Sequence, residues 1–348
     1  MNRDFNPQTT PVLIVPYVWI GDFVRCHSVV KVLHAQSPDL AVDILSSTLC
    51  APLADYMPGV RKAVVFDLPR RSLPLTRYFQ LADVLRDEHY TQALVMLRTW
   101  KSALAPWLAG IPLRTGFVGE ARYGLINDLR RGERALPRMI DRMGALALLP
   151  GEDLPAEWPL PELRVPESEI ETWRAKNGLA AEGRPVVAFC PGAVGKGKAW
   201  PPGHYAALAR DLAKDGVLVW VLGGPGETAI AAEIAAAGGE RVRDLTGHDL
   251  RNAIIALAAA DAAVTNDSGL MHVAAAIGTP TMAIFGPTSP WHWKPLNPVE
   301  AILEPPTDSA TLERMRTLGN DAVAHRRTAG VPVDRVAQAV RAALAKKS

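Results

Sequence analysis

The sequence predicts an α/β protein of two domains, each built around a parallel β-sheet. Three observations support this fold class. The chain has 348 residues, more than a single core usually organises. Short apolar runs alternate with helix-length segments in both halves, as they do when helices connect parallel strands. A proline-rich stretch at residues 150–168 separates the halves. We therefore expect domains at 1–155 and 156–330, and a C-terminal helix at 331–348 that packs back on the first domain.

The expected strands of the first domain are short, continuous apolar runs, which are typical of strands buried on both faces. They lie at Val12–Val15 and at residues 41–45, 63–66 and 93–97. One helix is expected after Gly21 and another at residues 78–87.

The second domain repeats the alternation of strands and helices. Its strands are expected at residues 185–189, 217–222, 262–265 and 281–285. Its helices are expected at residues 169–177, 204–214, 250–260 and 333–346.

Residues 261–290 contain the clearest strand–helix–strand unit. Apolar residues recur at helical spacing from Leu270 to Ile277, and Gly278 is placed to end that helix. The turn at Ser268–Gly269 then joins the carboxyl end of a strand to the amino end of a helix. Free backbone N–H groups and the helix dipole favour a diphosphate there. The alternative is an ordinary turn that holds no ligand.

Asp22 lies where the first strand passes into the first helix. One interpretation is an N-cap, which is common for aspartate. The other is a general base at the carboxyl edge of the sheet. The two interpretations do not exclude each other.

Residues 98–131 join a polar pair, an apolar helix and a glycine-containing basic loop. The pair is Lys101–Ser102, and the loop carries Arg114 and Arg122. Arginines on a loop suit phosphate or carboxylate recognition through paired N–H donors. The alternative is a solvated basic face.

Two further residues follow strands of the second domain. Gly192, Gly197 and Lys198 fit part of a P-loop spacing, but Ala199 stands where a P-loop has Ser or Thr, so we exclude an NTPase. Lys198 then either neutralises a phosphate or is an exposed loop lysine. Glu227 either bonds a ribose hydroxyl or stabilises the next helix.

Composition limits the class of protein. A net charge of +2 does not indicate a nucleic-acid binder. Three widely spaced cysteines have no metal-ligand spacing and fit reduced thiols in the cytoplasm. No apolar run is long enough to span a bilayer, and the N-terminus lacks a secretory pattern. We expect a cytoplasmic protein that reaches any membrane substrate from the cytoplasmic surface.

Two such domains predict a cleft with Asp22 and basic loops on one side and Lys198, Glu227 and the Ser268–Gly269 turn on the other. This division suits a transferase with a nucleotide donor and a separate acceptor. No G-x-G-x-x-G follows the first strand, which argues against a nicotinamide dehydrogenase.

Several segments resemble the ADP-heptose:lipopolysaccharide heptosyltransferases, and residues 101–130 are most similar to the second transferase of that family. The resemblance implies a GT-B fold, with two Rossmann-like domains facing a cleft. The segments are WIGD (19–22), KSALAPWLAGIPLRTGFVGEARYGLINDLR (101–130), FCPGA (189–193), KAWP (198–201), NDSGLMHVAAA (266–276) and FGPTSP (285–290).

The resemblance also implies roles for individual residues. Asp22 matches the family's catalytic base and Lys198 the lysine that supports the donor diphosphate. The donor site then comprises Ser268, Gly269, Leu270, His272, Asp267, Glu227, Gly286 and Thr288. The acceptor residues rest on charge alone and are Lys101, Ser102, Arg114 and Arg122.

The activity implied is an inverting transfer of L-glycero-D-manno-heptose from ADP-heptose to the first heptose of the lipopolysaccharide inner core. The expected partners are ADP-heptose and a Kdo–lipid A core acceptor at the inner membrane surface. No cofactor or metal is expected, since no carboxylate cluster has ligand spacing. The alternatives are another acceptor in the core, or a non-catalytic protein that binds a nucleotide sugar.

Overall fold

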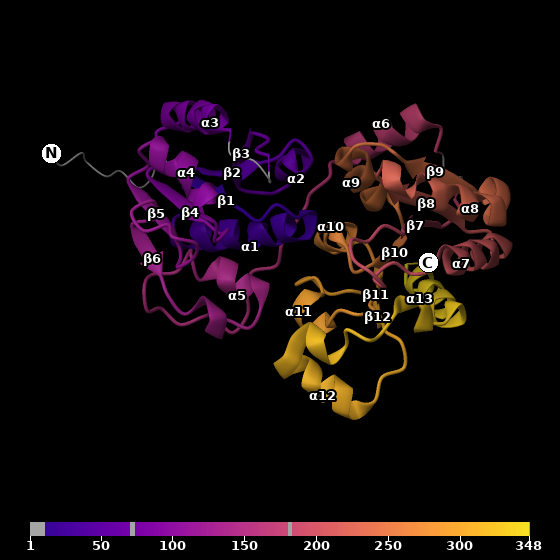
Figure 1. The fold of residues 1–348 in the computed structure, drawn as a ribbon. Coiled ribbons are helices and arrows are strands. Elements are labelled where there is room, and N and C mark those ends of the chain that lie inside the picture. The colour runs from indigo at the N-terminus through magenta and orange to yellow at the C-terminus, as the bar shows by residue number, and fades with distance from the viewer. Residues whose placement is uncertain (1–10, 70–73, 180–182, 348) are drawn as a thin grey trace. The chain divides into compact units, whose positions relative to one another are not determined.

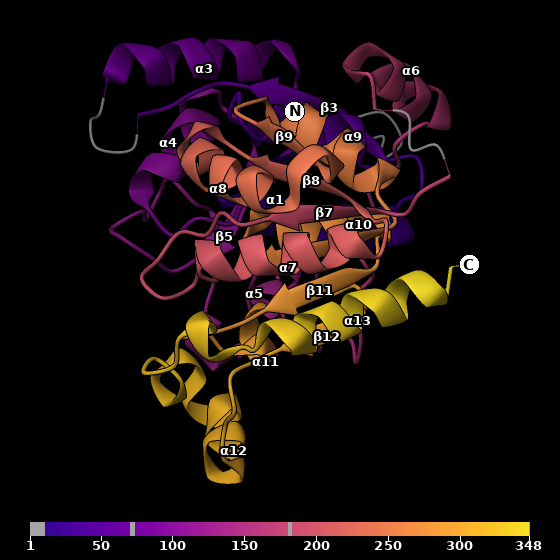
Figure 2. The ribbon, with the colours of Figure 1, turned by 90° about the vertical axis from the view of Figure 1, so that its right-hand side faces the viewer.

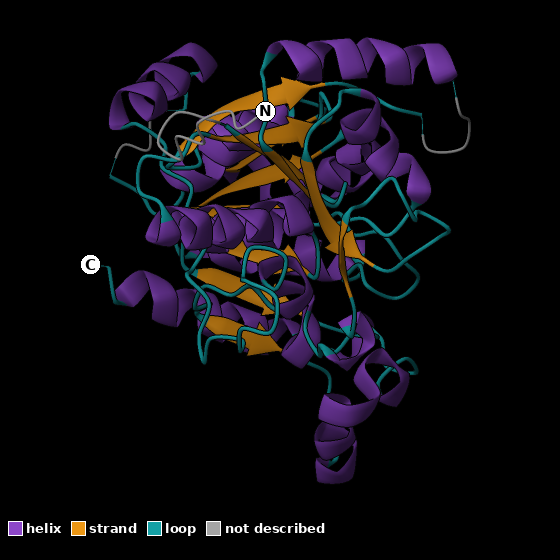
Figure 3. Ribbon diagram, turned by 90° about the vertical axis from the view of Figure 1, so that its left-hand side faces the viewer, coloured by secondary structure: helices purple, strands orange, loops and turns teal. Residues whose placement is uncertain are grey.

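A computed structural model describes residues 11–69, 74–179 and 183–347. The chain forms two compact units, Met1–Glu162 and Leu163–Ser348, so the division falls a few residues beyond the expected boundary at 155. Each unit contains one six-stranded parallel sheet with helices packed on it (Figure 1). Figure 3 distinguishes these strands from the helices and loops.

The first sheet has the strand order β3-β2-β1-β4-β5-β6, and all neighbouring strands are parallel. Its strands are β1 (Val12–Val15), β2 (Val42–Ser46), β3 (Val60–Val65), β4 (Gln92–Val95), β5 (Leu113–Phe117) and β6 (Asp128–Arg130). Its helices are α1 (Ile20–Gln36), α2 (Ala51–Asp55), α3 (Leu75–Asp87), α4 (Trp100–Leu108) and α5 (Met139–Gly144).

The first sheet is covered on both faces. Leu13 and Val15 of β1 belong to a buried cluster with Leu81 of α3 and Ala103 of α4. Because side chains alternate along a strand, the neighbouring buried Ile14 points to the opposite face. Helices α1 and α5 pack against each other in this unit, and Figure 1 shows them together below the sheet.

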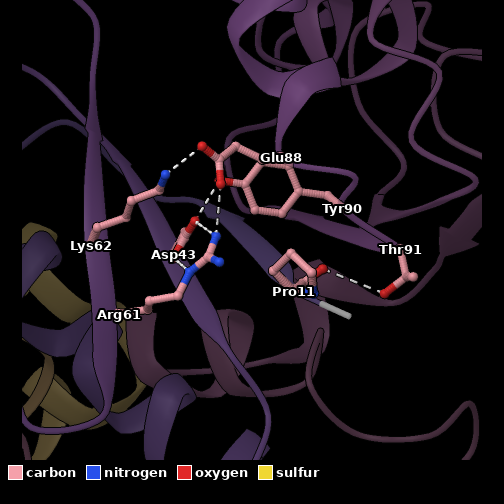
Figure 4. A network of polar contacts seen from close by, with 7 residues as sticks. All are labelled: Pro11, Asp43, Arg61, Lys62, Glu88, Tyr90 and Thr91. Carbon is pink, nitrogen blue, oxygen red and sulfur yellow. Dashed lines mark hydrogen bonds and ion pairs between the residues drawn. The ribbon is translucent and has the colours of Figure 1, made fainter. Parts of the chain in front are cut away.

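A buried carboxylate joins strands β2 and β3 to the segment between α3 and β4, near the amino end of this sheet. Asp43 of β2 is fully buried and accepts hydrogen bonds from Arg61 Nε (2.8 Å) and the Tyr90 hydroxyl (2.6 Å). Glu88 bonds Arg61 (3.0 Å) and Lys62. Figure 4 shows these side chains converging on Asp43 and Glu88. The hydrogen bonds and the ion pair with Arg61 compensate the buried charge of Asp43, which would otherwise be costly.

The second sheet has the order β12-β11-β10-β7-β8-β9 and is also parallel throughout. Its strands are β7 (Val186–Cys190), β8 (Leu218–Gly223), β9 (Val242–Thr246), β10 (Ala262–Asn266), β11 (Thr281–Ile284) and β12 (Ala301–Leu303). Its helices are α6 (Glu167–Asn177), α7 (Pro202–Lys214), α8 (Thr228–Gly238), α9 (Leu250–Ala259), α10 (Gly269–Ile277), α11 (Pro290–Trp293), α12 (Ser309–Leu318) and α13 (Val333–Ala345).

One face of this sheet buries α7, α8 and α13 in a single apolar cluster. Val336 and Val340 of α13 are fully buried there, and Figure 2 shows α13 running beside α7, β11 and β12. The C-terminal helix was expected on the first domain, but its apolar face is covered by the second unit. Helix α12 extends away from the same sheet (Figure 2).

The expected strands and helices are observed with end shifts of a few residues, and the first strand is Val12–Val15 as expected. Helix α6 ends at Gly178, whose φ of 63° is left-handed, as the Asn-Gly pair predicts. The elements that the sequence patterns did not predict are α2, β5, β6, α5, β9, α11, β12 and α12. A helix after Glu227 was expected without bounds, and α8 is that helix.

Candidate functional site

The predicted donor residues gather at one edge of the second sheet. Parallel strands place their carboxyl ends at the same edge. The loops that follow β7, β8, β10 and β11, together with the start of α10, carry all of these residues. These residues are Lys198, Glu227, Asp267, Ser268, Gly269, Leu270, His272, Gly286 and Thr288. The structure therefore brings together residues separated by up to ninety positions in the sequence.

The turn after β10 opens a helix as predicted. Ser268 is the N-cap residue of α10, with an extended backbone (φ −148°, ψ 175°). Within the described residues, its hydroxyl makes no capping hydrogen bond to the helix. Ser268, Gly269 and Leu270 are only half-buried, so the first turn of α10 is partly exposed. A helix terminus of this kind binds phosphate oxygens through N–H groups and the helix dipole.

Lys198 stands beside this helix terminus. Its ammonium forms an ion pair with Asp267 (2.7 Å), and Asp267 is almost fully buried. Asp267 also accepts a hydrogen bond from the Thr288 hydroxyl (2.7 Å). Three predicted donor residues thus form one chain of contacts, which fixes a cation next to the amino end of α10.

The loop that carries Lys198 turns through two glycines. Gly195 (φ 122°) and Gly197 (φ 79°) both have left-handed backbone conformations, which residues with a Cβ adopt at a cost. The Lys198 N–H donates to the Gly195 carbonyl (3.3 Å). Helix α7 begins only at Pro202, as the Trp-Pro-Pro sequence predicts.

Glu227 lies at the end of the short 3₁₀ turn Pro225–Glu227, which follows β8. A Cβ built on Gly192 would come within 2.9 Å of the Glu227 carboxylate, and one built on Gly223 within 2.8 Å of its Cβ. The glycines at the ends of β7 and β8 therefore leave room for this carboxylate at the donor edge. A carboxylate there suits a ribose hydroxyl.

Asn266 was missed by the sequence patterns. It is the last residue of β10 and fully buried. Its amide donates to the Pro191 carbonyl (2.6 Å) and its oxygen accepts from the Trp200 N–H (3.0 Å). It therefore ties both ends of the Lys198 loop to the strand that leads to Ser268. A polar residue at the end of a buried strand was the available signal.

In the first unit, Asp22 occupies the third position of α1, and the N-cap is Trp19. The N-cap interpretation of Asp22 is therefore wrong, although a carboxylate in the first turn still complements the helix dipole. Asp22 is 7% exposed and accepts a hydrogen bond from the buried Arg25 (2.9 Å). It follows the carboxyl end of β1, the edge where a general base was expected.

Tyr17 and Glu133 add to the electrostatics around Asp22. Burial, and then the charges of Glu133 and Asp22, raise the pKa of Tyr17 to about 12. The phenol is therefore neutral at physiological pH. Glu133 is buried and pairs with Arg98 (2.9 Å), so Tyr17 feels the charges of two carboxylates, Glu133 and Asp22, and of two arginines, Arg142 and Arg98.

The contacts of the predicted acceptor arginines favour a structural role. Arg122 is 1% exposed, and among the described residues its guanidinium donates to the backbone carbonyls of Phe117 (2.9 Å from Nε) and Leu97. Arg114 likewise donates to the carbonyls of Leu125 (2.7 Å) and Ile111. These guanidinium groups hold the loop in place. From their charge alone, this structural role could not be distinguished from ligand binding.

Lys101 and Ser102 lie in the first turn of α4 and are half-buried. The Ser102 hydroxyl donates to the Thr99 carbonyl (2.7 Å), and the Ser102 N–H donates to the capping Thr99 hydroxyl (3.4 Å). Ser102 therefore takes part in capping α4, and an acceptor role for Lys101 stays a prediction.

Among the described residues, no group of three or more His, Cys, Asp or Glu side chains is placed to hold a metal ion. In the same part of the chain, no helix combines the length and apolar character that crossing a bilayer requires.

Known proteins resemble this chain over both of its units. The profile of glycosyltransferase family 9 (heptosyltransferase) matches residues 78–320. The chain is 39% identical over 298 residues to lipopolysaccharide heptosyltransferase 2 of Escherichia coli (strain K12), which covers 82% of this chain and 85% of that protein. It is 37% identical over 306 residues to lipooligosaccharide heptosyltransferase 2 of Haemophilus influenzae, with 84% and 88% covered. The solved structure of E. coli ADP-heptose lps heptosyltransferase II superposes with a TM-score of 0.84 and 34% identity, covering 97% of this chain and 99% of that one.

The chain has two Rossmann-like units, and a helix terminus suited to phosphate binding lies at the edge of the second sheet. Together with the structural similarity, these features define a glycosyltransferase of the GT-B class. The length of the family match and the sequence identity then identify the family within this class. The chain belongs to glycosyltransferase family 9, the heptosyltransferases.

Proposed function

We propose that this protein transfers L-glycero-D-manno-heptose from ADP-heptose to the first heptose of the lipopolysaccharide inner core. The observation that carries the proposal is the edge of the second sheet, where Lys198, Asp267 and the amino end of α10 gather. The proteins named heptosyltransferase 2 that resemble this chain over more than four fifths of its length support the choice of donor and acceptor.

The donor diphosphate binds at the amino end of α10. Backbone N–H groups of Ser268, Gly269 and Leu270 contact phosphate oxygens, and Lys198 supplies a positive charge beside them. Glu227 accepts a hydrogen bond from the ribose. His272, Gly286 and Thr288 complete the donor side of this edge.

The reaction is a single displacement with inversion. The acceptor hydroxyl attacks the anomeric carbon of the heptose, the bond from that carbon to the diphosphate oxygen breaks, and ADP leaves with the electron pair. Asp22 takes the proton of the attacking hydroxyl. Lys198 and the helix terminus stabilise the negative charge that develops on ADP. No metal ion is needed for this charge, because these groups already supply it.

The protein acts in the cytoplasm or peripherally on the cytoplasmic face of the inner membrane, where a Kdo–lipid A core acceptor is accessible. Lys101 is the remaining acceptor-side cation of those predicted from sequence, since Arg114 and Arg122 donate to backbone carbonyls.

The test uses purified protein, ADP-heptose and Kdo–lipid A acceptors that carry zero, one or two heptoses. We expect transfer only to the acceptor with one heptose, at a rate unchanged by a chelator, and a product of inverted anomeric configuration. Transfer to another acceptor would replace the proposed function by that of a different heptosyltransferase. ADP binding without transfer to any acceptor would instead indicate a non-catalytic nucleotide-sugar-binding protein.

A further inference from the structure

A short segment far from the donor residues in sequence holds two of the donor loops. This segment, Arg326–Thr328, lies between α12 and α13, and its first and last side chains are 5% and 1% exposed. Burying an arginine and a threonine requires that their polar atoms find partners. Those partners identify what the segment does.

Arg326 binds the loop that follows β11. Its Nε donates to the Gly286 carbonyl (3.0 Å) and its Nη2 to the Thr288 carbonyl (3.3 Å). Its Nη1 bonds Glu304 (2.7 Å), which balances the buried charge. The guanidinium therefore fixes the backbone of the residue whose hydroxyl contacts Asp267, the partner of Lys198.

Thr328 binds the other loop, on both sides of Lys198. Its hydroxyl lies 2.6 Å from the Ala199 carbonyl and 3.2 Å from the Gly197 carbonyl, and its N–H donates to the Gly197 carbonyl (3.3 Å). The residues immediately before and after Lys198 are thus anchored to one threonine. These contacts fix the backbone from which the flexible Lys198 side chain extends.

The two loops and the segment also meet without a gap at Gly286. A Cβ on this residue would lie 2.7 Å from the Thr328 nitrogen and 2.9 Å from the Gly197 carbonyl oxygen. Both neighbours are backbone atoms, which cannot move aside as a side-chain tip can. The absence of a side chain at Gly286 is what allows this three-way contact.

We propose that Arg326 and Thr328 are positioning residues of the donor site, which hold Lys198 and the Gly286–Thr288 loop in register with the amino end of α10. The proposal rests on the proposed function for the identity of the donor. Neither residue touches the diphosphate; each acts through a loop that does. Catalytic groups that are held in place lose less freedom when charge develops on the leaving group, so their preorganisation lowers the barrier.

The first test compares Thr328→Val, which removes the hydroxyl at nearly constant shape, with Thr328→Ser, which retains it. The matched control is Thr279→Val. Thr279 is another buried threonine of the same unit, and its hydroxyl donates to the Leu257 carbonyl (2.8 Å), away from the donor loops. ADP affinity is measured by titration calorimetry, and thermal unfolding is followed on the same samples.

We expect Thr328→Val to weaken ADP binding about tenfold, the effect of losing roughly one well-made hydrogen bond. Thr328→Ser and Thr279→Val retain the affinity of the unmodified protein. Equal ADP affinity in Thr328→Val and the unmodified protein overturns the proposal, and so does an equal loss in the Thr279→Val control.

The second test asks whether Thr328 acts through Lys198. In a double-mutant cycle, Thr328→Val is combined with Lys198→Ala. We expect the tenfold effect to fall to about twofold or less when the lysine is absent, because the hydroxyl then has no cation to position. If Thr328→Val weakens ADP binding just as much in the Lys198→Ala background, Thr328 does not act through Lys198 and this part of the proposal is overturned. ADP binding is measured without acceptor or sugar, so a failure of the proposed heptose transfer leaves these outcomes readable.

Discussion

Arg25 donates to the Asp22 carboxylate over 2.9 Å, one helical turn apart on α1, and both side chains are at most a tenth exposed. A hydrogen-bonded ion pair between two buried side chains holds both of them in one geometry. The pair therefore orients the Asp22 carboxylate at the carboxyl edge of the first sheet. The charges of Glu133, Arg142 and Arg98 act on the same neutral phenol, Tyr17, as the charge of Asp22 does.

Replacing Arg25 by Met tests this pairing. The substitution keeps much of the side-chain volume but removes the positive charge, so the Asp22 carboxylate loses the partner that orients it. We expect kcat/KM for heptose transfer to fall about tenfold, because a misplaced base is less effective. Arg25→Lys retains a charged partner and should lose less of the rate. A fall in rate that only matches a loss of folded protein would show that Arg25 stabilises the fold and does nothing more.

Asp22→Asn tests the proposed base directly. The amide preserves the shape and most hydrogen bonds, but it cannot accept the proton of the attacking hydroxyl. We expect heptose transfer to fall at least about a hundredfold, while ADP affinity stays unchanged because the predicted donor residues all lie in the second unit. Calorimetry with ADP and the transfer assay are run on the same preparation. Loss of both together would assign Asp22 a structural role.

Gly192→Ala tests the place of Glu227 at the donor edge. The added methyl would lie 2.9 Å from the Glu227 carboxylate, the mobile end of a side chain, so the clash moves the carboxylate at little cost in stability. We expect ADP affinity to fall about three- to tenfold, as in Glu227→Gln. The Kd values for ADP, AMP and adenine are compared. A loss of affinity for ADP and AMP, but not for adenine, assigns the effect to the ribose.

The matched control for that substitution is Gly203→Ala in α7. A Cβ there meets only the Glu233 carboxylate, at 3.8 Å, which is ordinary contact. This variant is expected to bind ADP as the unmodified protein does. If Gly192→Ala behaves like the control, Glu227 does not contact the nucleotide.

The sequence predicts the central strands well because each is a continuous apolar run that a sheet covered on both faces requires. β1, β7 and β10 are buried along their whole length. The edge strands β6 and β9 escaped prediction for the opposite reason. β6 (Asp128–Arg130) is short and half-buried, and β9 (Val242–Thr246) has two exposed residues, so neither has an apolar pattern.

The site residues also divide into those that local sequence patterns can predict and those that they cannot. Ser268 and Lys198 could be predicted because a turn before a helix and a lysine in a glycine loop are local patterns. Arg326 and Thr328 could not, because their partners lie some 40 to 130 positions away. Arg122 was predicted as an acceptor residue from its charge alone, and its carbonyl partners, which favour a structural role, could not be predicted. Long-range hydrogen bonding, rather than residue type, decides these roles.

The first unit carries a built-in sensitivity to acid at His27. This side chain is fully buried, with Nε2 2.7 Å from the Pro58 carbonyl and Nδ1 accepting from the Glu162 N–H (2.8 Å). These partners fit the neutral tautomer with the proton on Nε2. Burial, which disfavours the charged ring, lowers the pKa of His27 from 6.5 to about 4.

The sign of the effect on stability follows from proton uptake. Between pH 6.5 and about 4 the unfolded chain binds a proton at this histidine and the folded chain does not, so stability is complete above pH 6.5 and declines as the pH falls. From pH 7.5 to pH 5 this histidine should remove about 2 kcal/mol from the free energy of unfolding of the first unit. Urea unfolding of the full chain over this range measures the loss.

His27→Gln removes the titrating ring, and we expect it to reduce the pH dependence by that amount while lowering stability at pH 7.5. The control is His89→Asn in the same unit. His89 is exposed, with a left-handed backbone (φ 55°) that Asn tolerates, so its replacement should leave the pH dependence unchanged. If His27→Gln retains the full slope between pH 7.5 and 5, the acid sensitivity arises elsewhere and the ring at position 27 is protonated in the folded protein.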